Sequence, residues 1–373
     1  MRILHKYLII DFLIMFLMTL SLFTFVMSIG VVIKAIDLLA KGISLDIILQ
    51  VFIYNMPYVM MFSIPMSTLT TALLLVGRLS MDGEITAMKA SGLSIWQITS
   101  PIIVFSIILS FICVYLNSDL APKSHFARRT TLTHVKSADP IHLLEEGHFI
   151  RDFPGLSIYI GGKDENNVKD IVMYEFGPHG VKQCIRAETG RLKMEEEQNA
   201  LVVDLYEVRI DQPDENNPLD PSKTQSIKAQ HIVKKLNFSE LFNEKKIKKK
   251  VADMTLMELI HVIHDIKKHF PYLSEKERVR ERLVMVVEAN GRIVLSLSCF
   301  AFTLLGIPLG MKSRRRESSI GIGISLLLVI IFYFFIIIAE ALVDYPAFRP
   351  DLISWIPVLC YELIGFVMIR RLN

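Results

Sequence analysis

The sequence lacks the residues and motifs on which most enzymes and cofactor-binding proteins depend. It has only four cysteines in 373 residues, and none forms a CxxC pair or a Cys/His cluster that would suggest a metal site. There is no nucleophile elbow, no HExxH motif and no pair of carboxylates at helical spacing. The net charge is only +3, which provides no general basic field for nucleic acid. We therefore expect no catalytic residues, no metal and no nucleic-acid partner.

A nucleotide site is also missing from the sequence. The stretch from Gly306 to Ser313 (GIPLGMKS) is only faintly similar to a phosphate-binding loop. Its spacing is wrong and no strand precedes it, whereas a phosphate loop joins a strand to a helix. We interpret it as the end of a membrane helix followed by positive anchoring residues.

Long apolar runs are what the sequence has in abundance. Apolar residues make up 52% of the chain, mean hydropathy is +0.42, and the apolar residues concentrate toward the two ends. A spanning helix needs about 20 such residues. The first run is too long for a signal peptide and has no cleavage motif. Six spans are predicted, at Leu8–Ile33, within Ile47–Val76 (with kinks at Pro57 and Pro65), and at Ile95–Leu116, Ile293–Met311, Ile320–Ala339 and Leu352–Ile369.

The positive charges in short loops predict the orientation. Ten lysines and arginines fall on the side of the two termini, against three on the other side. Short cytoplasmic loops carry such an excess, so both termini and the loop between spans two and three should be cytoplasmic. The polar insert between spans three and four should lie across the membrane. The ten are Arg2, Lys6, Arg78, Lys89, Lys312, Arg314, Arg315, Arg316, Arg370 and Arg371; the three are Lys34, Lys41 and Arg349.

The polar insert has a β-rich part and a helical part. Short alternating runs between about Glu146 and Phe238 predict strands, with turns at Gly161-Gly162 and Asp211–Pro221. A sandwich, a jelly roll or a related β-fold would fit this spacing. Capping patterns at Thr255/Glu258 and Ser274/Glu277 then predict helices, the second continuing into span four. Examples of the expected strands are His148–Phe153, Leu156–Ile160, Val168–Phe176, Ala200–Val208 and Ser226–Val233.

These patterns divide the chain into four parts. Residues 1–118 hold the first three spans, with a short cytoplasmic helix at about 80–91. Residues 119–253 form the β-domain, 254–292 a helical connector, and 293–373 the last three spans. The predicted fold is a six-helix membrane protein with an all-β, jelly-roll-like domain inserted between helices three and four.

The short cytoplasmic stretch from Gly77 to Gly92 is the most informative local pattern. Asp82 and Glu84 favour a helix N-terminus because acidic groups stabilise that end of the dipole. Gly92 suits the residue just after a helix, and Ser94 with Gln97 caps the next one. A short surface helix joined tightly to two spans could transmit force, or could be an ordinary linker.

Two further groups stand out in the membrane segments. Lys34 and Lys41 are seven residues apart, so they share a face of a continuous helix. They could anchor the helix at the interface, with Asp37 as a local partner, or form an anion site for a phosphorylated lipid. Glu362 lies inside span six, where we expect a buried pair or a hydrogen bond to a neighbouring helix. Three cysteines in apolar runs, Cys113, Cys299 and Cys360, should be small buried hydrophobes.

Several of these motifs resemble those of the LptF/LptG (YjgP/YjgQ) permeases of lipopolysaccharide export, over essentially the whole chain. The most specific is Gly77-Arg78-Leu79-Ser80 through Glu84, followed by Ala87-Met88-Lys89-Ala90-Ser91-Gly92. Gly147–Ile150 with Tyr159-Ile160 is similar to the family's first periplasmic strands. Leu305–Gly310 with Arg314–Arg316, and Trp355-Ile356-Pro357, also fit.

The resemblance implies a transport subunit of the bacterial inner membrane, with its β-domain and connector in the periplasm. Its partners would be a second LptF/LptG-type permease, an LptB-like ATPase dimer, an LptC-like periplasmic protein and lipopolysaccharide. The chain would need no cofactor, since ATP-Mg binds to the ATPase. Arg78, Asp82, Glu84, Met88 and Gly92 would form the coupling site, with Glu84 contacting the ATPase.

The resemblance also bears on the lipid and on the paralogue. Lys34 and Lys41 match LptG residues near lipid phosphates, whereas Leu305–Arg316 is more similar to LptF, so the paralogue stays open.

Two other readings remain from the sequence. One is an ABC-type permease or a mechanotransmission subunit for another lipid or a lipoprotein, with the same spans. The other is an intramembrane enzyme, which would need polar residues clustered at one depth. The spans offer only isolated ones such as Asp11 and Glu362.

Overall fold

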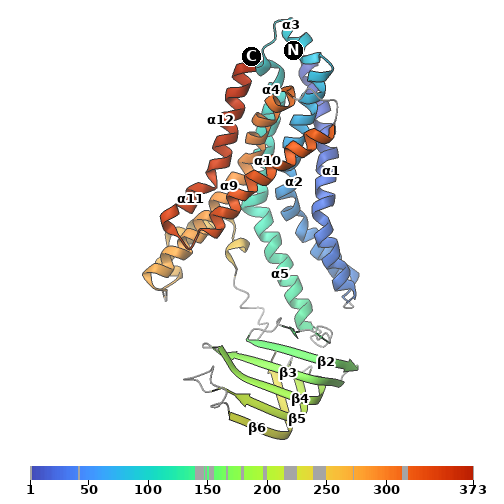
Figure 1. Ribbon diagram of the computed structural model, residues 1–373, viewed down its shortest axis with the longest axis vertical. Coiled ribbons are helices and arrows are strands. Elements are labelled where there is room, and N and C mark those ends of the chain that lie inside the picture. Colours follow the sequence, from blue (N-terminus) through green and yellow to red (C-terminus); the bar gives the residue numbers. More distant parts are fainter. Residues whose placement is uncertain are drawn as a thin grey trace. The chain divides into compact units, whose positions relative to one another are not determined.

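The computed structural model falls into two compact units, each of which is discontinuous in sequence (Figure 1). The first is Met1–Ile36 with Leu49–Arg128 and Lys249–Asn373, and the second is Asp37–Ile48 with Arg129–Lys248. The structure describes residues 2–40, 43–138, 147, 149–150, 155–164, 167–177, 180–195, 200–213, 225–237, 249–271, 273–312 and 318–372. We describe each unit by itself.

Helices make up the first unit almost entirely, because its sequence is dominated by long apolar runs. The long helices are α1 (Arg2–Ala40), α2 (Leu45–Met81), α4 (Ile95–Tyr115), α5 (Ala121–Ala138), α9 (Glu275–Lys312), α10 (Ser318–Ala341) and α12 (Trp355–Leu372). The short ones are α3 (Glu84–Ala90), α7 (Leu256–His264), α8 (Ile266–His269) and α11 (Pro350–Ile353), with 3₁₀ turns at Val251–Asp253 and Pro346–Phe348.

The described helices confirm the predicted membrane segments. Five of them are long and apolar enough to cross a bilayer, and a sixth span results if α11 and α12 are counted together. The sixth span, predicted at Leu352–Ile369, is bent near its start, where the two pieces meet at 48°. The bend follows from Pro357, which has no N–H to donate to the carbonyl of Ile353 at the break. Pro57 and Pro65 both lie inside α2.

Helix α4 does not end where the third span was expected to end. It continues through one π-helical turn, Leu116–Leu120, into α5, so residues that we assigned to the β-domain are helical. Polar contacts explain the extension. The buried Asn117 amide donates to Ser296 Oγ of α9 at 2.9 Å, and Arg128 donates to Asn55 Oδ1 of α2 at 2.5 Å.

Helix α9 is the element around which the first unit packs. It begins with the predicted capping box, in which Ser274 N donates to Glu277 Oε2 at 2.8 Å, and it runs unbroken into span four. Glycines bring its neighbours very close. A Cβ on Gly365 of α12 would lie 2.5 Å from the Leu304 carbonyl oxygen of α9, and one on Gly310 would lie 2.7 Å from that of Leu73 in α2.

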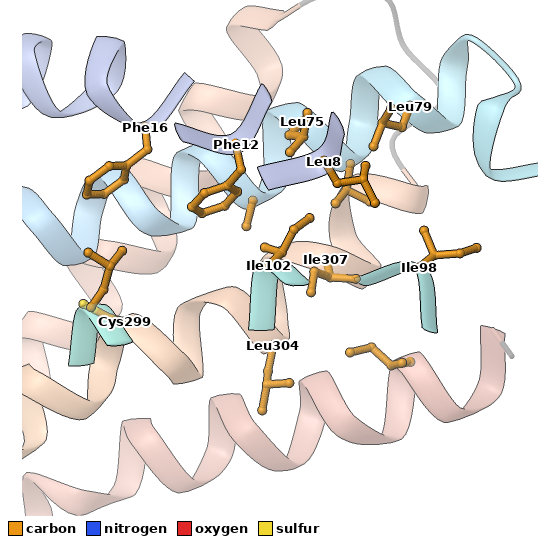
Figure 2. Packing of buried hydrophobic residues seen from close by; sticks show 14 of the residues in the cluster. Leu8, Phe12, Phe16, Leu75, Leu79, Ile98, Ile102, Cys299, Leu304 and Ile307 are labelled. Atoms are coloured by element: carbon orange, nitrogen blue, oxygen red, sulfur yellow. The ribbon is translucent and has the colours of Figure 1, made fainter. Parts of the chain in front are cut away.

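The largest core cluster joins α1, α2, α4 and α9 (Figure 2). Aromatic rings at Phe12 and Phe16 of α1 face aliphatic side chains such as Leu75 of α2 and Ile102 of α4. Burying each of these side chains stabilises the packed helices against separation by van der Waals contact, since lipid itself is apolar. The cluster also contains Ile85 of α3 and Ile369 of α12.

The second unit contains one antiparallel sheet of six strands, in which each strand pairs with its neighbour in sequence. The strands are β1 (Phe149–Ile150), β2 (Leu156–Asp164), β3 (Asn167–Gly177), β4 (Gly180–Glu195), β5 (Ala200–Gln212) and β6 (Gln225–Asn237). The register aligns Ile160, Ile171, Ala187 and Val208 across four strands, and all four are buried. One face of the sheet is therefore apolar, as the alternating pattern requires.

Two expectations about this sheet were wrong. Gly161-Gly162 forms no turn but lies within β2. A glycine is needed at position 161 because a Cβ there would come within 2.7 Å of the Asp170 Cβ on β3. The glycine makes room for a cross-strand neighbour whose own backbone has a φ of 51°. The loop expected from Asp211 starts later, since β5 continues to Gln212. Residues 214–221 of that loop, and 151–153 of the first expected strand, lie outside the described residues.

An ion pair shows that the sheet is strongly curved. Lys234 Nζ of β6 lies 2.9 Å from Glu175 Oε2 of β3, although β4 and β5 separate these strands. On β4, the residue paired with Glu175 is Gln183. Lys234 pairs with Val203 of β5, which in turn pairs with Leu192 of β4, so the two positions are offset along the strands by the length from Gln183 to Leu192. On a flat sheet the two positions would be about 30 Å apart. The curvature brings them together over the sheet; closure into a jelly roll stays a prediction.

Candidate functional site

The short helix α3 lies in a tight hairpin between α2 and α4. It begins at Glu84, a little later than expected, because Gly83 has a φ of 74° that ends α2 and starts a new helix. At its other end Gly92 has a φ of 88°, and the N–H groups of Gly92 and Leu93 donate to the carbonyls of Lys89 and Met88. This is the left-handed glycine cap predicted from the sequence. Ser94 and Gln97 then form the predicted capping box of α4.

One face of α3 is fixed to the helical core. Ile85 is buried at 6% exposure and belongs to the cluster of Figure 2, against which Met88 also packs. Asp82 is exposed, and its side chain has no partner among the described residues. One side of the hairpin is therefore packed against the helical core, and the other side is exposed.

Two polar contacts tie this hairpin to α1. The Tyr7 hydroxyl lies 3.4 Å from each carboxylate oxygen of Glu84. Arg78, at the end of α2, forms an ion pair with Asp11 one turn further along α1. Since Tyr7 and Asp11 are four residues apart, they share a face of α1. The sequence did not single out either as part of this site; the only signal was an acid at position 11 inside an apolar run.

Further contacts reach the ends of α9 and α12. Ser80 Oγ donates to the Met311 carbonyl of α9 at 3.2 Å, and Lys89 Nζ donates to the Leu372 carbonyl of α12 at 2.6 Å. The two chain ends lie near α3 at the same end of the helical unit (Figure 1). Glu84 and Lys89 of α3 thus contact α1 and α12, Ser80 at the end of α2 contacts α9, and α3 is joined through short loops to α2 and α4.

The predicted lipid-facing lysines are only partly described. Lys34 is exposed on α1, and it has no hydrogen bond or ion pair within the part of the chain that the structure covers. Lys41 lies outside the described residues. The proposed anion site therefore stays a prediction at both positions.

Other single residues differ from expectation. Glu362 is half-buried on α12 and makes no hydrogen bond or ion pair with any described residue, so the expected internal partner is wrong for this part of the chain. Cys113 and Cys299 are buried as predicted, with their sulfurs 3.6 Å apart between α4 and α9, whereas Cys360 is exposed. It faces away from the helical core because α12 contacts α9 through Gly365 and Tyr361 instead.

A second polar cluster fixes the start of the connector. Arg292 is 4% exposed within α9, pairs with Glu288 at 2.8 Å and donates to the Met254 carbonyl at 2.5 Å. Asp253, also buried, lies 2.6 Å from His125 Nδ1 of α5. A buried charge is stable only when it is paired and hydrogen-bonded, and Arg292 has both kinds of partner.

Comparison with known protein families decides the identity. The model of the family described as the lipopolysaccharide export system permease LptF/LptG matches residues 6–371. The chain belongs to this family. No curated protein matches it in a sequence search. An LptF/LptG member is a subunit of a lipopolysaccharide transporter and not an enzyme itself, and the apolar helices agree with a multi-pass protein of the inner membrane.

Proposed function

We propose that this LptF/LptG chain is one permease half of an ABC transporter that extracts lipopolysaccharide from the inner membrane. The transporter passes the lipid to a periplasmic β-jelly-roll bridge toward the outer membrane, and ATP hydrolysis in a separate subunit drives it. The observation that carries the proposal is the α3 hairpin, with Ile85 in the helical core and Glu84 at its surface. The family match supports the same assignment.

In this proposal the hairpin is the coupling element. A partner ATPase dimer of the LptB type docks on the exposed side, where Asp82 and Glu84 offer negative charge. When the ATPase closes on ATP, α3 moves with it. Its contacts with α1 and α12, and that of Ser80 at the end of α2 with α9, then transmit the movement to the membrane helices. Arg78, Met88 and Gly92 hold the hairpin in shape rather than touch the partner.

The remaining partners follow from the same proposal. A second LptF/LptG-type permease completes the membrane cavity, and an LptC-like protein accepts the lipid in the periplasm. Lys34 and Lys41 bind phosphates of the lipid at the outer leaflet. The apolar face of the β-sheet, with its buried isoleucines and valines, suits acyl chains during transfer.

Charge reversal at Glu84 tests the coupling. We expect Glu84→Lys to leave the permease folded and assembled but to uncouple ATP hydrolysis from export, because it replaces an acid by a base at the docking surface. Lipopolysaccharide release and ATP hydrolysis are measured together on the reconstituted transporter. Glu275→Lys makes the same charge reversal at an exposed acid outside the hairpin, at the first residue of α9; it is the matched control and should export normally. Wild-type export by Glu84→Lys would overturn the proposal.

A further inference from the structure

The helical connector contains a cavity that the coupling site does not use. Its volume is about 570 Å³, and it lies where α7 and α8 meet the first turns of α9. Ligand pockets in proteins have volumes of about 300–1,000 Å³. The lining consists of Ile260, Ile263, His264, Asp265, Ile266, Lys267, Lys268 and Arg282.

The charges around this connector cavity are unbalanced. Lys267, Lys268 and Arg282 are exposed, and none has an ion pair or hydrogen bond among the described residues. Asp265 is the one acid in the lining, so at least two positive charges remain.

Two further acids, on α9 and after α10, lie beside a different cation. Arg280 pairs with Asp344 at 2.5 Å and lies 3.5 Å from Glu281, and neither carboxylate lines the cavity. Three cations from two helices around one hollow form a site for an anion, most of all for phosphate, which Arg and Lys bind through charge-assisted hydrogen bonds.

The walls of the cavity are apolar. Ile260, Ile263 and Ile266 line it beside the cations. A fully hydrated inorganic anion would gain nothing from these side chains, whereas an amphiphile would bury apolar surface against them. The combination of cations and isoleucines therefore favours a phosphate group attached to an apolar body.

The cavity is preformed by its surroundings. Leu259 and Val262 of α7 are buried against Met285 and Ala289 of α9. The start of α7 is capped by Thr255 and Glu258, and Lys249 donates to Glu258 at 2.6 Å, which lowers the pKa of that carboxyl. A site built on packed helices keeps its geometry when the ligand is absent.

We propose that the connector cavity binds the phosphate-bearing headgroup of a glycolipid on its way out of the membrane. Arg282 precedes Ile293, the first residue of the apolar span, by a length of helix that rises at most about 16 Å. The headgroup layer of an ordinary phospholipid adds only about 5–8 Å on each side of the hydrocarbon core. A larger, phosphorylated sugar headgroup reaches this height. The inference deepens the proposed transport function and rests on it for the identity of the lipid.

Photocrosslinking in the full transporter tests this site. A photoreactive amino acid replaces Ile263, and the complex is titrated with bis-phosphorylated lipid A. We expect a crosslink that is lost when the phosphates are removed from the lipid. The combined variant Lys267→Gln, Lys268→Gln and Arg282→Gln should weaken binding about tenfold or more, as the loss of one charge-assisted hydrogen bond already would.

Control samples separate the alternatives. Lys276→Gln, an exposed cation on α9 that does not line the cavity, should bind like the wild type. Equal binding by the triple variant, by dephosphorylated lipid A or by phosphatidylglycerol vesicles would overturn the proposal, and so would displacement by inorganic phosphate at the same concentration as the lipid. The assay needs no ATP, so its failure is distinct from a failure of coupling at Glu84.

Discussion

The Glu84 carboxylate has no ion-pair partner among the described residues. Its only described side-chain partner is the Tyr7 hydroxyl, at 3.4 Å from both oxygens, which is longer than an ordinary hydrogen bond. A cation or backbone amide of a docking partner could replace that contact at little cost, because a hydrogen bond of this length is weak. The residue is thus ready to exchange an internal partner for an external one.

Lys34 is the described residue at which lipid contact can be tested directly. Because it is exposed and unpaired among the described residues, reversing its charge disturbs no internal ion pair. We expect Lys34→Glu to weaken crosslinking of a phosphorylated lipid to neighbouring α1 positions, and Lys34→Arg to preserve it. Unchanged crosslinking in Lys34→Glu would make this lysine an interfacial anchor only.

Glu175 makes the curvature of the β-sheet sensitive to acid. The hydrogen bond from Lys234, assisted by one from Gln183, lowers the pKa of this carboxyl below its usual 4.5. Its contribution to stability is therefore present at neutral pH and is lost as the pH falls through the lowered folded-state value. The pair is partly exposed, so the contribution is about 1 kcal/mol or less.

Hydrogen exchange in the intact chain checks this prediction. Protection of β3 and β6 amides, corrected for intrinsic rates, should decrease in acid for the wild type. In Glu175→Gln it should start lower and change less with pH. An identical acid response in the two proteins would show that the pair does not contribute.

Among the helices, the pairing of α1 with α2 offers the sharpest test of transmission. Asp11 and Arg78 form an ion pair close to the coupling hairpin, and each would leave an unpaired charge beside apolar residues if its partner were reversed. We expect Asp11→Arg and Arg78→Asp each to lower the amount of lipid exported per ATP hydrolysed. The double exchange should restore much of it.

Two control measurements distinguish a loss of coupling between the hairpin and α1 from a loss of folding. Thermal stability and complex assembly are measured for all three variants beside the export ratio. If both single variants export normally, or if the exchange fails to restore export in a folded complex, the ion pair does not link the hairpin to α1.

Elements with local signals were predictable, and those fixed by tertiary contacts were not. The caps at Ser94, Thr255 and Ser274 were confirmed because a capping box is written in four consecutive residues. The role of Gly161 was missed because it depends on Asp170 on another strand. The continuation of α4 into α5 was missed because Asn117 finds its partner, Ser296, far along the chain.

The candidate site shows the same division. The hairpin and its glycine cap could be predicted from the run Arg78–Gly92, since cap and dipole preferences are local. The parts played by Tyr7 and Asp11 could not be predicted, because only folding brings the start of α1 beside the hairpin between α2 and α4. The cavity in the connector was also invisible, as its cations come from two helices separated by a turn.

The orientation of the entire chain is a testable prediction of its own. The positive charges in the short loops predict that α3 is cytoplasmic and that the β-sheet lies on the other side of the membrane. Cysteines introduced at Thr86 of α3 and at Tyr159 of β2 should react with an impermeant reagent from opposite sides of the membrane. The exposed native Cys360 is first replaced by serine. Labelling of both positions from the same side would contradict the topology.

The unbroken course of α9 has a mechanical consequence. This helix is 38 residues long, about 57 Å, and about 44 Å of it separates Arg282 at the connector cavity from the Met311 carbonyl that accepts the Ser80 hydroxyl. Gly365 of α12 contacts this helix at Leu304, in its last quarter, so a rigid α9 pivoting there would have its long arm toward the connector. In the proposed transport cycle, a tilt of α9 by about 5° would move Arg282 by about 3 Å, so a small movement beside the α3 hairpin would reach the connector cavity.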